Sequence, residues 1–205
     1  MLIAFAFMKI WLLMFLNFPL IALYSQQWEL KKDEGDIQVY TRKLDSTKFN
    51  EYKAVLIAET TVDEVISVLT NGDSLNNWTY KTPESKQLEK ISDNEFIVWM
   101  RNDFPWPLND RDNVSRVKLK KLNNKTYQID IQAEDSLEHS VGKNVIRMNL
   151  FKGYWRVQEL DEDSVLIIQQ MYGDPNGVLP AWIVNSILVT FPYHSFENLK
   201  EILEK

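Results

Sequence analysis

Few side chains in this sequence of 205 residues have the types and spacing that catalysis or metal binding requires. His139 and His194 are the only histidines, and the chain has no cysteine. A zinc site would need more imidazole or thiolate ligands at set spacing, and a thiol nucleophile or a disulfide scaffold is excluded. The sequence also contains neither a glycine-rich phosphate loop nor a serine elbow between a strand and a helix. We therefore expect no catalytic residue, no bound metal and no cofactor.

The overall charge and the aromatic content narrow the class of ligand. Asp and Glu number 29 against 23 Lys and Arg, which gives a net charge of -6. A general nucleic-acid binder needs a basic surface, so we expect no nucleic-acid partner. The chain also contains 7 Trp, 8 Tyr and 10 Phe. Aromatic side chains fill cores, and they also line pockets for apolar ligands.

The first 25 residues are predicted to be a signal peptide or an N-terminal membrane anchor. Lys9 is the only charged residue up to Tyr24, and the composition turns polar at Ser25. If translation starts at Met8, the apolar stretch reaches about 22 Å as a helix, too short for a hydrocarbon core of ~30 Å. If it starts at Met1, the segment reaches about 36 Å and could stay as an anchor. We expect residues 26–205 to be exported, either periplasmic or secreted, or held at the membrane by residues 1–24.

The remaining residues alternate between strand patterns and two helical patterns. A capping box of Thr61 and Glu64 predicts a helix over 62–70, and a long apolar helix begins near Pro180 and is expected to kink or break at Pro192. A short helical turn is predicted over 28–33. Period-two patterns predict strands over 37–40, 49–59, 87–91, 95–101, 112–122, 126–133, 144–158 and 164–172. This order indicates an α+β fold, with one antiparallel sheet and its helices on one side.

The final helix is nearly apolar all round, which leaves two structures open. Ile183, Ile187, Phe191 and Leu199 follow helical spacing, and a helix without a polar face must be covered on most sides. A curved sheet could grip this helix with a hollow between them, and the hollow would hold an apolar ligand. A fully packed core without a hollow satisfies the composition equally well.

Two segments carry a resemblance to a known family. Residues 105–112 read PWPLNDRD, which resembles the PWPL-x-x-RD stretch of START domains, the steroidogenic-acute-regulatory-related lipid transfer family. Residues 174–185 read DPNGVLPAWIVN, which resembles the stretch that leads into the last helix of that family. Residues 35–42 and Trp78 also lie where the family has an early strand and a tryptophan. The likeness covers residues 28–205.

The resemblance implies a helix-grip fold, in which a strongly bent antiparallel sheet wraps around a long C-terminal helix. It also implies a START-like lipid-binding domain over 26–205, with non-covalent binding of one lipid or sterol-like molecule, its transfer, and transient membrane contact. No cofactor is implied. Two alternatives remain at this point: an enzyme of the aromatase/cyclase type on the same fold, and a partner-binding domain with a filled core.

Most residues of the two motifs are expected to serve the fold. Prolines stiffen the loop that enters a strand, and Arg111 and Asp112 should point to opposite sides of that strand and find different partners. The turn after residue 174 aims the chain into the final helix. The residues assigned this structural role are Pro105, Trp106, Pro107, Arg111, Asp112, Asp174, Pro175, Gly177 and Pro180.

The residues that would contact the lipid are predicted less directly. Several members of the family place an acid and a base in the tunnel, whereas this sequence offers mainly apolar candidates. Arg101, Arg147 and Gln169 are predicted to meet the polar end of the ligand. Wall contacts are predicted for Trp78, Trp99, Tyr154 and Trp182. Asn185, on an apolar helix, needs either a backbone or a ligand partner. We expect the opening at Pro192 and the loop 104–108.

Overall fold

The computed structural model describes residues 27–134, 139 and 142–205, so the predicted N-terminal signal peptide or anchor lies outside the described residues. Ten strands and two α-helices follow one another along this part of the chain. Their bounds are β1 Glu29–Glu34, β2 Ile37–Arg42, β3 Glu51–Glu59, α2 Val62–Thr70, the 3₁₀ turn η2 Leu75–Asn77, β4 Glu84–Ser92, β5 Glu95–Asn102, β6 Asp110–Asn123, β7 Thr126–Ala133, β8 Val145–Arg147, β9 Leu150–Glu159, β10 Ser164–Asp174 and α3 Ala181–Leu203.

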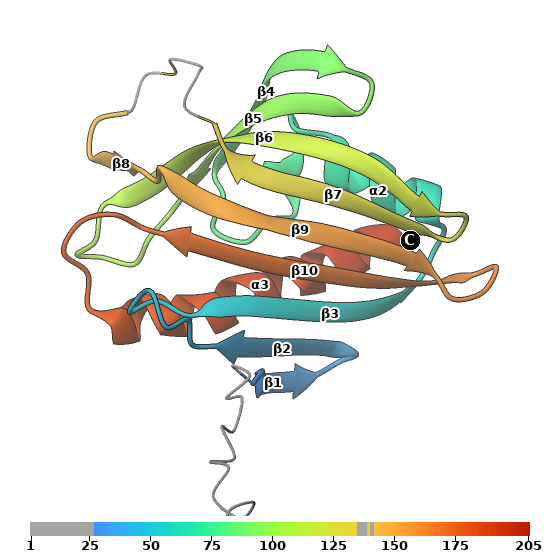
Figure 1. Cartoon of the computed structure of the whole chain (residues 1–205), viewed down its shortest axis with the longest axis horizontal. Helices are drawn as coiled ribbons and strands as arrows, with labels where there is room; N and C mark the ends of the chain where they lie inside the picture. The colour runs from blue at the N-terminus through green and yellow to red at the C-terminus, as the bar shows by residue number, and fades with distance from the viewer. Residues whose placement is uncertain (1–26, 135–138, 140–141) are drawn as a thin grey trace, which may run out of the picture.

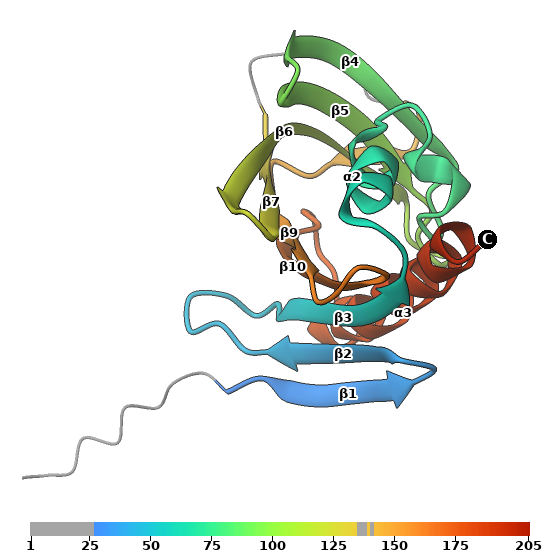
Figure 2. The ribbon, with the colours of Figure 1, turned by 90° about the vertical axis from the view of Figure 1, so that its right-hand side faces the viewer.

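The strands form one strongly curved sheet (Figure 1). Its order is β1-β2-β3-β10-β9-β7-β6-β5-β4, and neighbours along this path pair antiparallel. The short strand β8 adds to β6 in parallel. Figure 2 shows the sheet as an arc from β1 to β4, with α2 and α3 on its open side. The predicted α+β helix-grip fold, with a curved sheet wrapped around the C-terminal helix, is confirmed.

Alternation along the strands decides what faces α3. Ala54 and Leu56 of β3 and Val157 of β9 are fully buried on the concave side of the sheet. α3 packs against β2 and β3 and places Phe196 and Leu199 in the same core. Each large apolar side chain removed from water in this way contributes about 1.5–3 kcal/mol. The hydrophobic face of α3 is therefore covered by the arc of the sheet.

The capping box at the start of α2 is confirmed. The Thr61 hydroxyl accepts a hydrogen bond from the backbone N–H of Glu64 at 3.3 Å, and the Glu64 carboxylate accepts one from the N–H of Thr61 at 3.3 Å. α2 spans Val62–Thr70, as the sequence predicts. The hydrogen bond that the Thr60 hydroxyl donates to the Glu64 carboxylate, and those from the N–H and hydroxyl of Thr61, lower the pKa of this carboxyl.

The helical turn predicted over 28–33 is wrong, because these residues form strand β1. β1 pairs antiparallel with β2, from Glu29 opposite Thr41 to Glu34 opposite Ile37. Gly35 and Asp36 close the hairpin with positive φ angles of 58° and 64°, the conformation that a two-residue type I′ turn requires. Edge pairing thus overrides the helical preference of the Glu, Leu and Lys residues in this segment.

α3 runs unbroken over Ala181–Leu203, so of the kink or break expected at Pro192 the break does not occur. Proline cannot donate to the carbonyl four residues earlier, so Leu188 lacks its usual helical partner. Pro192 is buried, and neighbouring Tyr193 and Phe196 are also buried. Packing on the sheet therefore outweighs the lost hydrogen bond. Within the described residues, no helix combines the length and the apolar composition needed to cross a bilayer.

The long strand predicted over 144–158 is interrupted. The structure divides it into β8 and β9 at residues Met148 and Asn149. The N–H of Met148 donates to the carbonyl of Asp112 at 2.8 Å, which attaches this break to β6.

Candidate functional site

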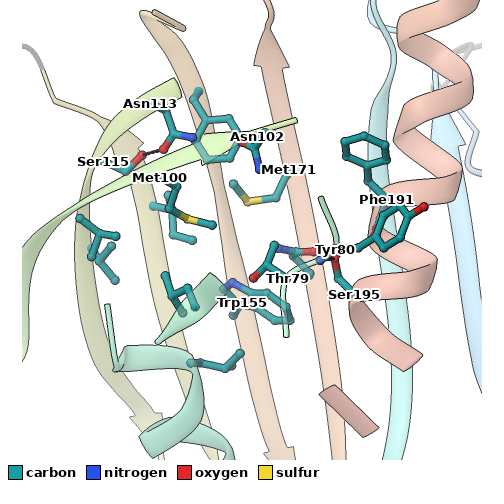
Figure 3. Close-up of a pocket in the computed structure, with 18 of the residues that line it drawn as sticks. Thr79, Tyr80, Met100, Asn102, Asn113, Ser115, Trp155, Met171, Phe191 and Ser195 are labelled. Atoms are coloured by element: carbon teal, nitrogen blue, oxygen red, sulfur yellow. Dashed lines mark hydrogen bonds between the residues drawn. The ribbon is translucent and has the colours of Figure 1, made fainter. Parts of the chain in front are cut away.

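A cavity of about 200 Å³ lies between the concave face of the sheet and α3. On the same measure one water needs roughly 10–15 Å³, so the space exceeds that of a single water by an order of magnitude. Side chains of β3, β5, β6, β7, β9, β10 and α3, together with the segment that follows α2, line it (Figure 3). The alternative of a fully packed core without a hollow is therefore wrong.

Apolar side chains make most of the wall. β5 contributes Phe96, Val98 and Met100, which alternate with outward-facing residues. α3 contributes Ile187 and Phe191 from the opposite side. At the end near α2, Trp78 meets Trp155 edge-to-face at 5.9 Å between ring centroids, and Trp155 stacks on Phe196 at 5.5 Å. Such a lining favours an apolar ligand.

Polar groups interrupt this wall at three places. The Ser115 hydroxyl donates to the Asn113 side-chain oxygen at 2.9 Å on β6 (Figure 3). The Tyr52 hydroxyl donates to the Gln169 side-chain oxygen at 2.9 Å, joining β3 to β10. The backbone N–H of Tyr80 donates to the Ser195 hydroxyl of α3 at 2.9 Å. Every polar side chain in the described lining is uncharged.

Tyr52 keeps its proton at physiological pH. Burial raises the pKa of its hydroxyl well above the ordinary value. The group therefore acts as a hydrogen-bond donor rather than as a base, which agrees with its contact to Gln169. The described lining contains no carboxylate, imidazole or amine, the groups that most often transfer protons in enzymes.

Two of the predicted ligand contacts, Trp78 and Gln169, do line the cavity. Trp78 is 5% exposed, and its Nε1 is buried without a hydrogen-bond partner among the described residues. Gln169 lies on β10 directly opposite Trp155 of β9. The structure thus brings these two side chains to one wall, and their contact with a ligand remains a prediction.

Arg101 and Arg147, predicted to meet the polar end of the ligand, lie outside the cavity lining. Arg101 donates to the Asp110 carboxylate at 2.6 and 2.9 Å and to Glu84 at 2.8 Å. Arg147 donates to both carboxylate oxygens of Asp112 at 2.8 Å. Carboxylates on the protein already occupy both guanidinium groups, so neither residue has geometric support as a ligand contact.

Trp99 and Tyr154, predicted as wall residues, also lie outside the lining. The Trp99 indole N–H donates to Asp112 at 2.8 Å, and the Tyr154 hydroxyl donates to Gln170 at 3.0 Å. Trp99 alternates with the lining residues Val98 and Met100 along β5. Its side chain therefore lies on the other face of the sheet.

The two residues of α3 that were predicted to contact the ligand also lie outside the cavity lining. Trp182 is 74% exposed at the start of the helix. Asn185 accepts a hydrogen bond from the backbone N–H of Asn50 at 3.0 Å, so its partner is backbone rather than ligand. Neither residue lines the cavity.

The two sequence motifs meet in the structure, and Arg111 joins them. This side chain is 1% exposed, and its guanidinium donates to the carbonyls of Pro175 at 2.7 Å, Asn176 at 3.1 Å and Asn109. Within the second motif, the Asp174 carboxylate accepts from the N–H of Asn176 at 2.9 Å. Arg111 thus fixes the start of β6 to the turn that leads into α3, which is a structural role.

Asp112 occupies the other side of β6, as alternation predicts. It is fully buried. Burial raises the pKa of its carboxyl, but the hydrogen bonds from Arg147 and Trp99 and the charge of Arg147 outweigh this effect and leave the pKa below its ordinary value. The carboxylate is therefore ionised, paired and directed away from the cavity.

The loop between β5 and β6 reaches the cavity through one residue. Phe104 lines it and faces Phe191 of α3 at 6.1 Å between ring centroids. The N–H of Leu108 donates to the carbonyl of Pro105 at 3.0 Å, which closes a turn with Trp106 at its tip, 92% exposed. The expected opening between this loop and α3 is thus a place where two aromatic side chains meet.

The curved sheet, the C-terminal helix and the apolar cavity between them define a helix-grip protein with an internal cavity. A sequence model of the START domain matches residues 18–199. The chain belongs to the START domain family.

Similar proteins extend this finding. The chain is 28% identical to the STAR-related lipid transfer protein of Xanthomonas axonopodis, whose structure superposes with a TM-score of 0.78 over 86% of this chain and 98% of that chain. It is 23% identical to the phosphatidylcholine transfer protein of Rattus norvegicus over 168 residues, 80% of this chain and 78% of the relative. Human StAR-related lipid transfer protein 5, at 15% identity, shares the fold, with a TM-score of 0.78 over 97% of this chain and 93% of that chain.

Several polar lining residues escaped the sequence analysis. Asn113 and Ser115 share the inward side of β6 with Val117. The alternation that places Val117 inward, continued toward the start of the strand, would have found both. Asn102 at the end of β5 and Thr79 after η2 had no comparable signal, because one ends a strand and the other lies in an irregular segment.

Proposed function

We propose that this protein binds one lipid molecule non-covalently in the cavity and carries it between membranes without chemical change. The observation that supports this most directly is an apolar cavity beneath α3 whose described lining is uncharged. START domains and proteins named for lipid transfer are similar to this chain over most of its length. Phosphatidylcholine is one candidate from the name of the rat relative, but the described lining holds no cation for its phosphate.

The energetics favour a carrier. Burying one methylene group is worth about 0.8 kcal/mol, so exposing a sixteen-carbon tail to water costs on the order of 13 kcal/mol. Moving the same tail from a bilayer into an apolar cavity makes this term nearly cancel. The protein then needs only a dry cavity, an opening and a brief contact with the membrane.

An enzyme of the aromatase/cyclase type is the main alternative. Such an enzyme from Streptomyces superposes on this chain with a TM-score of 0.51 at 13% identity, which is a likeness of fold alone. General acid–base chemistry usually uses His, Asp, Glu or Lys, and the described lining contains none of them. We therefore favour a binding function over catalysis.

The three most exposed of the large apolar residues lie at one end and support membrane contact there. The start of β6, the end of β10 and the start of α3 lie together at the left of Figure 1. Trp106, Val178 and Trp182, in the loops and helix turn at this end, are 92%, 101% and 74% exposed. Tryptophan is enriched where membranes meet water, so this end is the one we propose to touch the bilayer.

We also propose that the protein acts outside the cytoplasm. This rests on the apolar segment before Ser25, which is typical of an export signal or an anchor. Fractionation of cells that make the full chain would place it in the envelope or the medium, and its recovery solely from the cytoplasm would contradict export.

Lipid transfer between vesicles tests the proposed function. The full chain should accelerate the movement of at least one lipid class from donor to acceptor vesicles made of total membrane lipid. Ile131→Trp fills the cavity from β7 and should abolish transfer. Ile57→Trp, at a half-exposed position on β3 outside the lining, should not. No acceleration by the folded wild type would reject the function.

A further inference from the structure

The cavity offers no charge to a ligand within the described residues. Arg111 shares the inward side of β6 with Asn113, but it lies outside the lining, and each of its three nitrogens donates to a backbone carbonyl. Arg101 and Arg147 are paired with carboxylates on the protein. A phosphate or carboxylate inside the cavity would therefore be a buried charge without a partner, which is strongly unfavourable.

The lining nevertheless contains hydrogen-bond donors that the protein does not use. Asn113 is 2% exposed, and its side-chain oxygen accepts from Ser115 at 2.9 Å. Its amide nitrogen has no acceptor among the described residues. Figure 3 shows this nitrogen turned away from Ser115, toward the interior of the cavity.

Gln169 repeats this arrangement on the facing part of the sheet. Its side-chain oxygen accepts from Tyr52 at 2.9 Å, while its amide nitrogen donates to no described residue. The indole N–H of Trp155, on the strand beside it, has no described acceptor, and the buried N–H of Trp78 lacks one as well. In both amide pairs the contact within the protein is made by the oxygen, and the two indole N–H groups are donors whichever way the amides are turned.

We propose that the cavity selects an uncharged lipid whose polar groups are acceptor oxygens, such as the ester carbonyls of a diacylglycerol. Of these donors, the Trp78 indole N–H is buried without a partner, which is costly. A ligand with ester oxygens would offer acceptors to it and to the donors on the cavity wall without bringing a charge into the cavity. A lipid with the same two esters and a phosphate on the third glycerol carbon would bring a charged phosphate that nothing in the described lining neutralises. This proposal rests on the proposed function in lipid binding and names its substrate class.

The test compares two lipids that differ only in the headgroup. The full chain is incubated with vesicles of dioleoylphosphatidylcholine and dioleoylglycerol in equal amounts, and the bound lipid is identified by native mass spectrometry. We expect the dioleoylglycerol complex to exceed the phosphatidylcholine complex by about ten-fold or more. Equal occupancy, or an excess of phosphatidylcholine, would overturn the proposed selectivity and leave lipid binding intact. If neither lipid bound, the proposed function itself would fail.

Two variants separate the donors from the shape of the cavity. Asn113→Leu removes the free amide at nearly constant size and should lower dioleoylglycerol binding about five-fold, the effect of one lost hydrogen bond between uncharged groups. Met100→Leu, at the position directly opposite Asn113 on β5, alters the same wall without removing a donor and should lower dioleoylglycerol binding by less than Asn113→Leu does. If the two variants bound dioleoylglycerol equally, whether at the wild-type level or below it, the Asn113 amide would have no role of its own.

Discussion

Individual side chains on the two faces of β6 have opposite roles. Asn113 and Ser115 face the cavity, whereas Asp112 holds Arg147 and Trp99 on the outer side. Asp112 and Arg147 each adjoin a lining residue in the sequence, but the sheet separates their side chains from the cavity. This separation lets the Asp112–Arg147 pair stabilise the fold without placing its charges in the cavity.

Replacing Asp112 by Asn should destabilise the protein in a pH-dependent way. Breaking a buried ion pair by neutralising one partner costs about 3 kcal/mol. Because the pKa of the Asp112 carboxyl is lowered on folding, its stabilisation is present above the unfolded pKa of about 3.9 and is lost as pH falls through the folded value. Urea unfolding should therefore show a large difference between the variant and the wild type at pH 7, and a smaller one below pH about 4.

Asp110→Asn is the matched control. Asp110 pairs with Arg101, whose side chain is 35% exposed, so its loss should cost less than about 1 kcal/mol at pH 7. Equal losses for the two variants, or a pH-independent loss for Asp112→Asn, would show that the Arg147 pair does not stabilise the fold as described.

At the scale of elements, the sequence predicted most of the sheet but only part of the site. Period-two patterns and the capping box place nearly every strand and α2, because one face of each element is buried. The prediction for β1 was wrong because an edge strand is held by pairing with its neighbour rather than by a buried face. Trp99 and Arg101 were misplaced because β5 is apolar on both sides between Phe96 and Met100, so its alternation hides which side faces inward.

The contact between the β5–β6 loop and α3 yields a second prediction at this scale. Phe104 and Phe191 face each other and both line the cavity. Since the chain has no native cysteine, Phe104→Cys with Phe191→Cys can be joined by a reducible thiol cross-linker after lipid loading. The joined protein should retain its lipid and lose transfer between vesicles, and reduction should restore transfer.

Each single cysteine variant, treated with the same reagent, is the control and should continue to transfer lipid. Undiminished transfer by the joined double variant would show that the lipid passes elsewhere.

In the whole molecule, one end combines exposed apolar residues with a loop that reaches the cavity. The end that carries Trp106, Val178 and Trp182 is fixed by Arg111, which joins β6 to the turn before α3. The same end holds the loop of Phe104, which lines the cavity. Exposed tryptophans and a route toward the cavity therefore occur on one side of the protein.

Removing the exposed tryptophans should uncouple the protein from membranes. Trp106→Ser with Trp182→Ser deletes two large apolar groups, each worth about 1.5–3 kcal/mol when buried. Binding to vesicles in a sedimentation assay should fall at least about ten-fold, while lipid already in the cavity remains bound. Ile57→Ser removes an exposed apolar residue elsewhere and should leave vesicle binding unchanged. Equal vesicle binding by all three proteins would place the membrane contact on another surface.

The central claim is that the space between the sheet and α3 holds a lipid. The most direct measurement is native mass spectrometry of the full chain purified gently from its own cells, followed by identification of any released lipid. The account predicts one lipid molecule per wild-type chain and none in Ile131→Trp, with lipid retained in Ile57→Trp. A wild-type chain that never carries lipid, or an Ile131→Trp variant that carries as much as the wild type, would contradict it.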